Sequence, residues 1–448
     1  MPDPNSTRMT RRAYLAVGLM LFALFFGAGN LIFPAALGQR AGTNVWWAIT
    51  GFVFTGVGLP LAGVLAMGYS GCRNVQELAS RVHPLFGILF TLALYLSIGP
   101  AFAIPRTGTV SFEIAVRPFL SPDAGYWAQI VFLIVFFLVT LWLSINPQKL
   151  VGRIGGVLTP ILLTTIVILI VKSLITPIGT PGAPTSAYGS PTVALLQGFI
   201  DGYNTLDALA SFVFGILVIE FVTQHGATTR REVMGATMRA GMIAIGCLGL
   251  VYIFIAELGA ASVEKLGILD TGAPVLAGSA RLLFGEPGAL ILAVIVLLAC
   301  LTTSIGLVTA CASYFHAQFG GLSYKGYAVA FVIVSFAVGT FGLKTIISAA
   351  IPVLMFLYPL AIVLIALAFL HRRFGGRRSV YAWTVGLTLI SALISGLEAA
   401  QIPLGAFGSF YGAHVPLHAV GLDWIFFAVT GFLIGFLDRR KAWATSAQ

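Results

Sequence analysis

The sequence predicts an all-α integral membrane protein with about twelve transmembrane helices. Of its 448 residues, 58% are hydrophobic and only 9% are charged, and the mean hydropathy is +0.98. Soluble domains carry about 25% charged residues, so the composition excludes a soluble protein. Apolar runs that reach the ~20 residues of a membrane-spanning helix follow one another along the whole chain. Glycine and polar residues interrupt two of these runs, and a function is expected at those interruptions.

Twelve segments have the length and hydropathy of a membrane span. They are residues 12–37, 45–70, 84–112, 124–144, 148–174, 192–223, 231–258, 287–319, 323–343, 345–371, 379–402 and 421–437. The first, third, sixth and eighth are longer than one crossing requires, which indicates a tilt, a break or an added helix at the membrane surface. Residues 1–448 are expected to form a single transmembrane domain.

The distribution of lysine and arginine predicts the orientation in the membrane. With the N-terminus inside, 18 of the 25 basic residues lie at cytoplasmic ends and 7 lie on the other side. The seven are Arg40, Arg106, Arg117, Lys172, Lys265, Arg281 and Lys344. We therefore expect both termini in the cytoplasm and the protein in the inner (plasma) membrane. The first segment lacks a small-residue cleavage site after it, so it is expected to be retained.

The stretch "FFGAGNLIFP" (residues 25–34) interrupts the first segment with Gly27, Gly29, Asn30 and Pro34. An unpaired backbone group in hydrocarbon is costly, so a break there needs a compensating partner. Glycines that only allow close helix packing are spaced four apart, whereas these are two apart. The spacing favours an opened backbone that binds a ligand over a packing face.

The stretch "QGFIDGYNTLDALASFVFG" (residues 197–215) interrupts the sixth segment in the same way. Its apolar pattern is broken by Asp201, Gly202, Asn204, Thr205 and Asp207. Interrupted segments at corresponding positions of two halves are typical of inverted-repeat transporters, in which the site lies at the membrane midplane. We expect repeat one over about 12–175, an external connector at 176–191, repeat two over about 192–371, and two extra helices over about 379–437.

The ends of a broken helix determine which ligand it binds. Free N–H groups at a helix start attract a carboxylate, and free C=O groups at a helix end attract an ammonium or a metal cation. An α-amino acid carries both charges one carbon apart, so two opposed broken helices suit a small zwitterion. Apart from the carboxylates of the sixth segment, we expect no charged side chain at the midplane. The pocket should therefore select substrates by side-chain size.

Three motifs resemble those of the bacterial branched-chain amino acid:cation symporters. They are "FGAGNLIFP" in the first segment, "GYNTLDALA" in the sixth and "LTTSIG" in the eighth. The chain is more distantly similar to the leucine-transporter fold, whose first helix carries Gly-Asn…Phe-Pro and whose eighth carries Leu-Thr-(Ser/Thr)-Ser-Ile. Here the first motif reads Gly29, Asn30, Phe33 and Pro34, with one residue fewer between its two parts.

The resemblance implies a fold and a transport activity. The fold would contain five helices repeated in inverted orientation, followed by two more. The activity would be secondary active symport, importing leucine, isoleucine and valine together with a cation, which we expect to be sodium. No resident cofactor is expected.

Helix-end chemistry selects seven candidate substrate residues. We expect the N–H groups of Ala28, Gly29 and Asn30 to bind the carboxylate, and Tyr203, Asn204 and Thr205 to offer carbonyl or polar atoms to the ammonium, with Asp207 as a further candidate. Asp207 has an alternative role as a cap on the outer half of the sixth helix. The hydroxyl of Thr205 has an alternative hydrogen bond to a carbonyl of its own helix.

The resemblance also implies a sodium site between the first and eighth segments. Its ligands would be the carbonyls of Ala23, Phe26 and Ala299 and the hydroxyls of Thr302 and Thr303. The alternative is that both threonines hydrogen bond within their own helix. In related proton-coupled permeases a lysine in the fifth helix replaces the cation. Here Lys149 and Lys172 lie at the ends of that segment, which favours sodium.

Other classes of protein remain as alternatives. The nearest is a proton-coupled or uncoupled amino-acid permease of the same fold, and a channel is a more distant one. An enzyme is not expected, because the sequence contains no HExxH, GxSxG or P-loop GK[ST] motif, and "GAGN" lacks the third glycine of a dinucleotide fingerprint.

Overall fold

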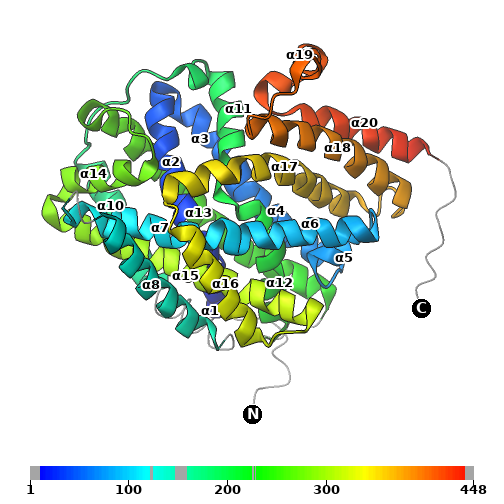
Figure 1. Ribbon diagram of the computed structural model, residues 1–448, viewed down its shortest axis with the longest axis horizontal. Helices are drawn as coiled ribbons and strands as arrows, with labels where there is room; N and C mark the ends of the chain where they lie inside the picture. Colours follow the sequence, from blue (N-terminus) through cyan, green and yellow to red (C-terminus); the bar gives the residue numbers. More distant parts are fainter. Residues whose placement is uncertain (1–10, 122–124, 147–158, 225–226, 228, 439–448) are drawn as a thin grey trace.

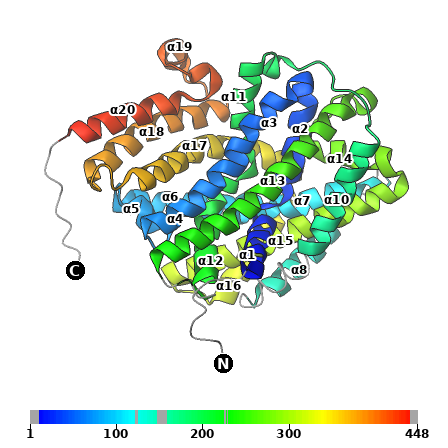
Figure 2. The same cartoon turned by 180° about the vertical axis from the view of Figure 1, so that it is seen from behind.

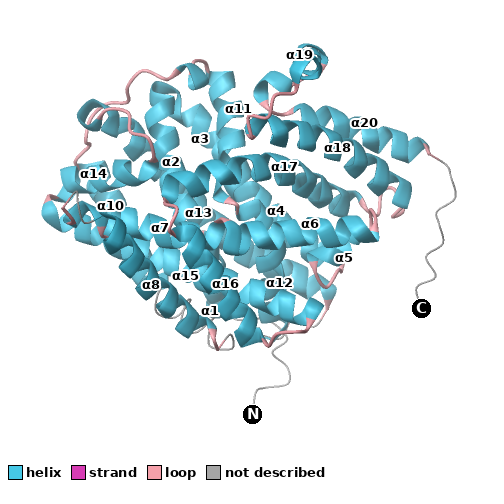
Figure 3. Cartoon of the chain, in the orientation of Figure 1, coloured by secondary structure: helices cyan, strands magenta, loops and turns pink. Residues whose placement is uncertain are grey.

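A computed structural model describes residues 11–121, 125–146, 159–224, 227 and 229–438, and all structural statements below concern these residues. Every regular element in this part of the chain is a helix, as Figure 3 shows. The first half contains α1 (Arg11–Phe25), α2 (Ala28–Ala41), α3 (Val45–Val53), α4 (Leu59–Ser70), α5 (Val75–Ser80), α6 (Pro84–Leu96), α7 (Ala103–Ala115), α8 (Gly125–Ser144) and α10 (Thr159–Ile175). The second half contains α11 (Pro191–Asp201), α12 (Asp207–Gln224), α13 (Arg230–Leu266), α14 (Gly272–Phe284), α15 (Glu286–Phe319), α16 (Tyr324–Gly339), α17 (Leu343–Leu370), α18 (Arg378–Ala399), α19 (Gly405–His414) and α20 (Asp423–Leu437).

The helices confirm the predicted all-α membrane class but not the exact count of twelve. Within the described ranges, seven helical stretches are long and apolar enough to cross a membrane, or eight when the bent pair α11 and α12 counts as one. Shorter apolar helices, among them α1, α10, α16 and α20, account for other predicted spans. The start of the predicted fifth segment, residues 148–158, lies outside the described residues. The bounds of the two repeats stay a prediction.

The first predicted segment is broken between α1 and α2, at Phe26 and Gly27. The break lies seven residues before Pro34, which is inside α2. A proline can remain within a helix when other groups satisfy the carbonyl it leaves free, so Pro34 does not mark the break itself.

The sixth predicted segment is broken between α11 and α12, which are bent by 49°. A short 3-10 turn over Gly202–Thr205 leads to Leu206, whose φ of 68° lies in the left-handed region. A residue with a β carbon rarely adopts this conformation, and here it redirects the chain at the break.

The third predicted segment also contains a break that the sequence analysis did not place. A five-residue π turn over Ser97–Ala101 separates α6 from α7, and Gly99 has non-helical φ and ψ of −93° and −126°. The following Pro100 has no N–H to donate, so the helical ladder is interrupted here. The helices α5 and α14 were also not predicted, since each is shorter than a membrane span.

The broken helices are held in the bundle by close helix contacts. A β carbon at Gly38 of α2 would lie 1.9 Å from the Ala256 carbonyl oxygen of α13, and one at Gly259 of α13 would lie 2.2 Å from the Ala35 oxygen of α2. These approaches require glycine. α18 and α20 lie together beside α17 at the edge of the bundle in both views (Figures 1 and 2). The helix breaks are therefore interior, and the last helices are peripheral.

Candidate functional site

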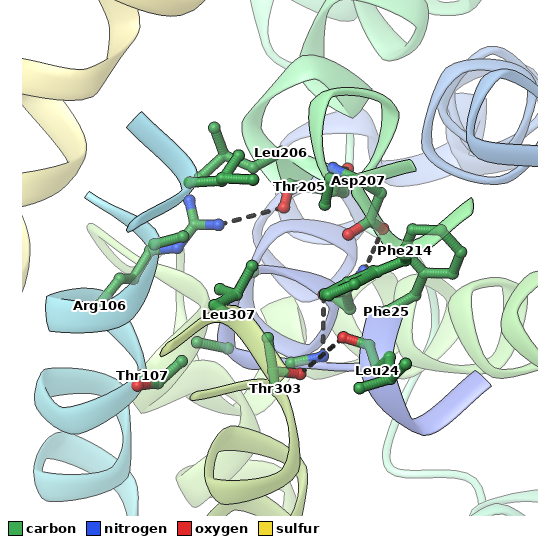
Figure 4. Close-up of a pocket in the computed structure, with 17 residues that line it drawn as sticks. Leu24, Phe25, Arg106, Thr107, Thr205, Leu206, Asp207, Phe214, Thr303 and Leu307 are labelled. Carbon is green, nitrogen blue, oxygen red and sulfur yellow. Dashed lines mark hydrogen bonds between the residues drawn. The ribbon is translucent and has the colours of Figure 1, made fainter. Parts of the chain in front are cut away.

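A small cavity lies where the two helix breaks meet (Figure 4). Its walls come from α1, α2, α7, α12 and α15, together with the residues at the breaks. The lining residues are Leu24, Phe25, Gly27, Ala28, Gly29, Asn30, Ile98, Ala103, Arg106, Thr107, Thr205, Leu206, Asp207, Ala210, Phe214, Thr303 and Leu307. Most are apolar, and the few polar groups converge from different helices, which is the usual composition of a small-molecule site.

One wall of the cavity is the start of α2. Ala28, Gly29 and Asn30 are its first three residues, all buried. The N–H groups of a first helical turn have no partner within the helix, so this wall attracts negative charge. The side-chain oxygen of Asn30 accepts a 3.0 Å hydrogen bond from the Gly27 N–H and holds the break in shape. The structure thus brings the three residues predicted for the carboxylate to the cavity; their role stays a prediction.

Another wall carries Asp207, the first residue of α12 and only 4% exposed. Its Oδ2 accepts hydrogen bonds from the Asn30 side-chain amide and, at 3.0 Å, from the hydroxyl of Tyr252 on α13. Asp207 therefore begins the half-helix that follows the break, not the outer half that follows the connector. Its carboxylate joins α2 and α13 to α12. Sequence reasoning missed Tyr252, because a tyrosine in an apolar helix carries no distinctive signal.

Of the three residues predicted to bind the ammonium at the α11–α12 break, one lines the cavity and two do not. Thr205 lines the cavity, and its hydroxyl donates to the Gly202 carbonyl (2.9 Å) and accepts from the Asp207 N–H (3.3 Å). Tyr203 is not among the lining residues; its ring stacks on Tyr358 of α17 with centroids 4.3 Å apart. Asn204 is not among them either.

The carbonyls of the α11–α12 break are bound by an arginine that the sequence analysis had placed at the outer side. Arg106 of α7 is 4% exposed and lines the cavity. Its Nη1 donates to the Asn204 carbonyl at 2.7 Å, and its Nη2 donates to the Thr205 carbonyl at 3.2 Å. The guanidinium carbon also lies 5.3 Å from the ring centroid of Phe33. The expectation of no charge at the midplane outside the sixth segment is therefore wrong.

A signal for this arginine was available in the sequence. Arg106 lies within the apolar stretch "AFAIPRTGTV" (residues 101–110). A charge inside a membrane segment is a functional candidate by default. Counting it as an end-of-helix charge concealed that signal, because the predicted third segment ended only six residues later.

The predicted sodium ligands lie around the contact between α1 and α15. The Thr302 hydroxyl is 2.9 Å from the Ala299 carbonyl and 3.1 Å from that of Ala23, so its hydrogen bonds lie both within its helix and across to α1. The Thr303 hydroxyl is 3.1 Å from the carbonyl of Leu24, a residue that was not predicted.

Phe26, the remaining predicted sodium ligand, is the last residue before Gly27. It is fully buried, its ring stacks on Phe22, and its N–H donates to the Phe22 carbonyl at 2.7 Å. Hydroxyl and carbonyl oxygens are the donors that hard cations prefer. Among the described residues there is no group of three or more His, Cys, Asp or Glu that could hold a metal ion.

Comparison with protein families matches residues 10–442 to the model "Branched-chain amino acid transport protein". The chain is 47% identical over 432 residues to branched-chain amino acid permease BrnQ of Bacillus subtilis, covering 96% of this chain and 98% of that protein. It is 45% identical to branched-chain amino acid permease BraB of the same organism, covering 94% of each. It is 40% identical to the branched-chain amino acid transport system 2 carrier protein of Pseudomonas aeruginosa, covering 92% of each.

Solved structures of cation-coupled and amino-acid transporters share the fold. MHP1, a nucleobase-cation-symport-1 family transporter, matches with a TM-score of 0.59 at 15% identity, covering 97% of this chain and 94% of that one. MhsT in complex with L-phenylalanine matches with 0.57 at 17% identity, covering 96% and 98%. A Na+-coupled sialic acid symporter matches with 0.58 at 12% identity, covering 94% and 89%. At these identities the likeness concerns the fold alone, and it confirms the predicted leucine-transporter-like architecture.

Proposed function

Because the chain belongs to the family of branched-chain amino acid transport proteins, we propose that it is a secondary active symporter that imports leucine, isoleucine and valine together with sodium. It works by alternating access from the inner (plasma) membrane, with both termini in the cytoplasm. Its relatives are named as permeases and carriers, and the chain is a membrane transporter and not an enzyme.

The observation that carries the proposal is the cavity between the two helix breaks. The first turn of α2 offers N–H groups to a carboxylate, and Asp207 offers a carboxylate to an ammonium. The rest of the wall is largely apolar, with Leu24, Phe214 and Leu307 among its members. A zwitterion with an aliphatic side chain satisfies both polar ends and the apolar wall at once.

Sodium coupling is supported by the donor set beside the cavity. The hydroxyls of Thr302 and Thr303 face carbonyls of α1 at 3.1 Å, and Thr303 also lines the cavity. Neutral oxygens bind a monovalent cation weakly enough to release it after each cycle. An ion here would contact the residues that form the break, so ion and substrate would share one structural element.

Proton coupling is the second candidate, and one observation favours it. Asp207 is a buried carboxylate in the cavity wall that could take up and release a proton in place of the ion. The two couplings make opposite predictions about which gradient drives uptake, so one assay separates them.

Counterflow and gradient-driven leucine uptake in proteoliposomes test the proposal. Uptake should rise with an inward sodium gradient and persist when the proton gradient is dissipated. Thr302→Ala and Thr303→Ala should raise the sodium concentration for half-maximal uptake by about tenfold, since each removes a hydroxyl ligand. Ser304→Ala is the matched control, because Ser304 is equally buried on α15 and its hydroxyl has no partner in the described structure. If leucine uptake does not depend on sodium but is lost when the proton gradient is dissipated, the coupling ion is the proton and not sodium.

Competition by other amino acids tests the substrate class. One methylene in a hydrophobic pocket is worth roughly 1–3 kcal/mol, so alanine and glycine should compete poorly with leucine. Strong competition by lysine or glutamate would contradict a site for branched-chain substrates.

A further inference from the structure

We propose that Arg106 receives the α-carboxylate of the substrate, and that Arg106 and Asp207 form a pair of opposite charges that restricts the site to free α-amino acids. The inference rests on the proposed function and deepens it, because it assigns each end of the zwitterion to a side chain. Arg106 was not among the substrate residues predicted from the sequence, whereas Asp207 was.

The charge of Arg106 is buried without a counter-ion in contact. A guanidinium stays protonated in proteins, and burying a charge is costly unless it is paired. Within the described residues, no carboxylate lies within ion-pair distance of Arg106. Its bonds go to the neutral carbonyls of Asn204 and Thr205. Asp207 lines the same cavity and acts on Arg106 electrostatically, but the two form no ion pair in contact.

One N–H donor of this guanidinium has no hydrogen-bond acceptor within the described structure. The Nε of Arg106 is fully buried and has no hydrogen-bond partner in the part of the chain that is described. Nε–H and one Nη2–H point in the same direction from the planar group, which is the edge that binds a carboxylate through two parallel hydrogen bonds. Nη2 also makes the longer of the two carbonyl bonds, at 3.2 Å. An arriving carboxylate would satisfy the orphan donor.

The guanidinium and the start of α2 lie at the same end of the cavity. A β carbon at Gly29 would lie 2.8 Å from Nη2 of Arg106 and 3.2 Å from its Cζ. The absence of a side chain at Gly29 is what lets the arginine approach the first turn of α2. The free N–H groups of that turn and the arginine therefore act on the same anionic group.

Asp207 lies on the other side of the cavity. Figure 4 shows Arg106 on one side and Asp207 on the other, with Thr205 between them and Leu307 below. The Oδ2 of Asp207 accepts hydrogen bonds from the side chains of Asn30 and Tyr252. An ammonium at this side and a carboxylate at the other satisfy both charges. A substrate that lacks either charge leaves one of them buried and unpaired, which is costly.

Arg106 could instead serve only as a clamp on the carbonyls of the α11–α12 break. The two roles differ in what they predict for analogues. A clamp supports the shape of the site, so its loss weakens all ligands alike. A carboxylate receptor discriminates between leucine and leucinamide, which has the same side chain and ammonium but no carboxylate.

The test measures the binding of leucine, leucinamide and 4-methylpentanoate to the purified full chain by calorimetry at saturating sodium. The parent protein should bind leucinamide at least about 50-fold more weakly than leucine. Arg106→Gln should weaken leucine binding by about 10- to 100-fold and leucinamide binding by less than about threefold. The ratio of the two dissociation constants should therefore fall close to one. Arg106→Lys should restore part of the ratio. Asp207→Asn should weaken the binding of leucine but not the binding of 4-methylpentanoate, which lacks the ammonium.

The control is Arg117→Gln, which removes an exposed arginine just beyond the end of α7 that pairs with Glu113 at 3.0 Å. It should leave all three affinities unchanged. An unchanged leucine-to-leucinamide ratio in Arg106→Gln would overturn the assignment, as would equal binding of the two ligands by the parent protein. The second result needs no variant, so it holds even if Arg106→Gln does not fold. Failure of the parent protein to bind leucine at all would instead overturn the proposed function.

Discussion

Replacing Gly27 by alanine should weaken the binding of sodium far more than the binding of leucine. A β carbon at Gly27 would lie 2.7 Å from the hydroxyl oxygen of Thr303 and 3.0 Å from its Cβ and Cγ2. The backbone at Gly27, with φ −124° and ψ −157°, is extended and accessible to alanine. The effect of the substitution therefore comes from contact with Thr303 and not from backbone strain.

The size of the effect follows from this geometry. Carbon atoms in contact prefer about 3.5–4.0 Å, so the Thr303 side chain must retreat or rotate by several tenths of an ångström. Its hydroxyl is 3.1 Å from the Leu24 carbonyl, and such a shift moves the hydroxyl away from the position of the proposed sodium ligand, a loss comparable to that of one neutral hydrogen bond. One neutral hydrogen bond is worth about 0.5–1.5 kcal/mol, which corresponds to a roughly 2- to 13-fold change in an equilibrium constant. We expect the sodium concentration for half-maximal leucine uptake to rise by that factor.

The assay is sodium-dependent leucine uptake in proteoliposomes, with leucine affinity measured separately at saturating sodium. Gly246→Ala is the matched control, because a β carbon at Gly246 of α13 meets no atom within 4 Å. Leucine affinity at saturating sodium should change by less than twofold in Gly27→Ala. Unchanged sodium dependence in Gly27→Ala, or an equal change in Gly246→Ala, would refute the placement of sodium beside Thr303.

Two further predictions concern topology and packing. In a background without the four native cysteines, Ser186→Cys, exposed in the connector, should react with an impermeant maleimide in intact cells, whereas Leu322→Cys, exposed after α15, should react only after lysis; the reverse pattern would invert the predicted orientation. Gly38→Ala should lower the melting temperature in detergent, because its β carbon would lie 1.9 Å from a backbone oxygen of α13 that no rotamer change can move, and overpacking of this kind costs about 1–3 kcal/mol. A melting temperature equal to that of Gly246→Ala would contradict the close α2–α13 contact.

The sequence predicted the two helix breaks because their signal is local. Gly27, Gly29 and Asn30 interrupt one apolar run and Gly202 and Asp207 interrupt another, and hydrocarbon penalises such residues unless they have a purpose. The same locality explains why the structure brings five of the seven predicted substrate residues to the cavity wall. Tyr203 is an exception, because the direction of a side chain at a break depends on a backbone turn that no periodicity specifies.

The partners of Arg106 and Tyr252 depend on tertiary contacts and cannot be read from a local pattern, although the charge of Arg106 inside an apolar stretch marks it as a candidate. Arg106 reaches the carbonyl of Asn204, 98 residues later, and Tyr252 reaches Asp207, 45 residues earlier. The π turn at Gly99 also shifts the register of the third segment relative to a straight helix. Without that break, counting along the helix places Arg106 near a membrane surface and not beside the cavity.

In the proposed mechanism, the α1–α2 break links ion to substrate through a few consecutive residues. The carbonyl of Leu24 faces Thr303 at 3.1 Å, and three residues later the Gly27 N–H donates to Asn30, whose amide donates to Asp207. In this mechanism, a change in the position of Leu24 on sodium binding would pass through one short piece of backbone to Asp207. Such coupling is reciprocal by thermodynamic necessity: leucine must strengthen sodium binding by the factor by which sodium strengthens leucine binding. The break that costs hydrogen bonds within a continuous helix thus provides the element by which two cargoes can depend on each other.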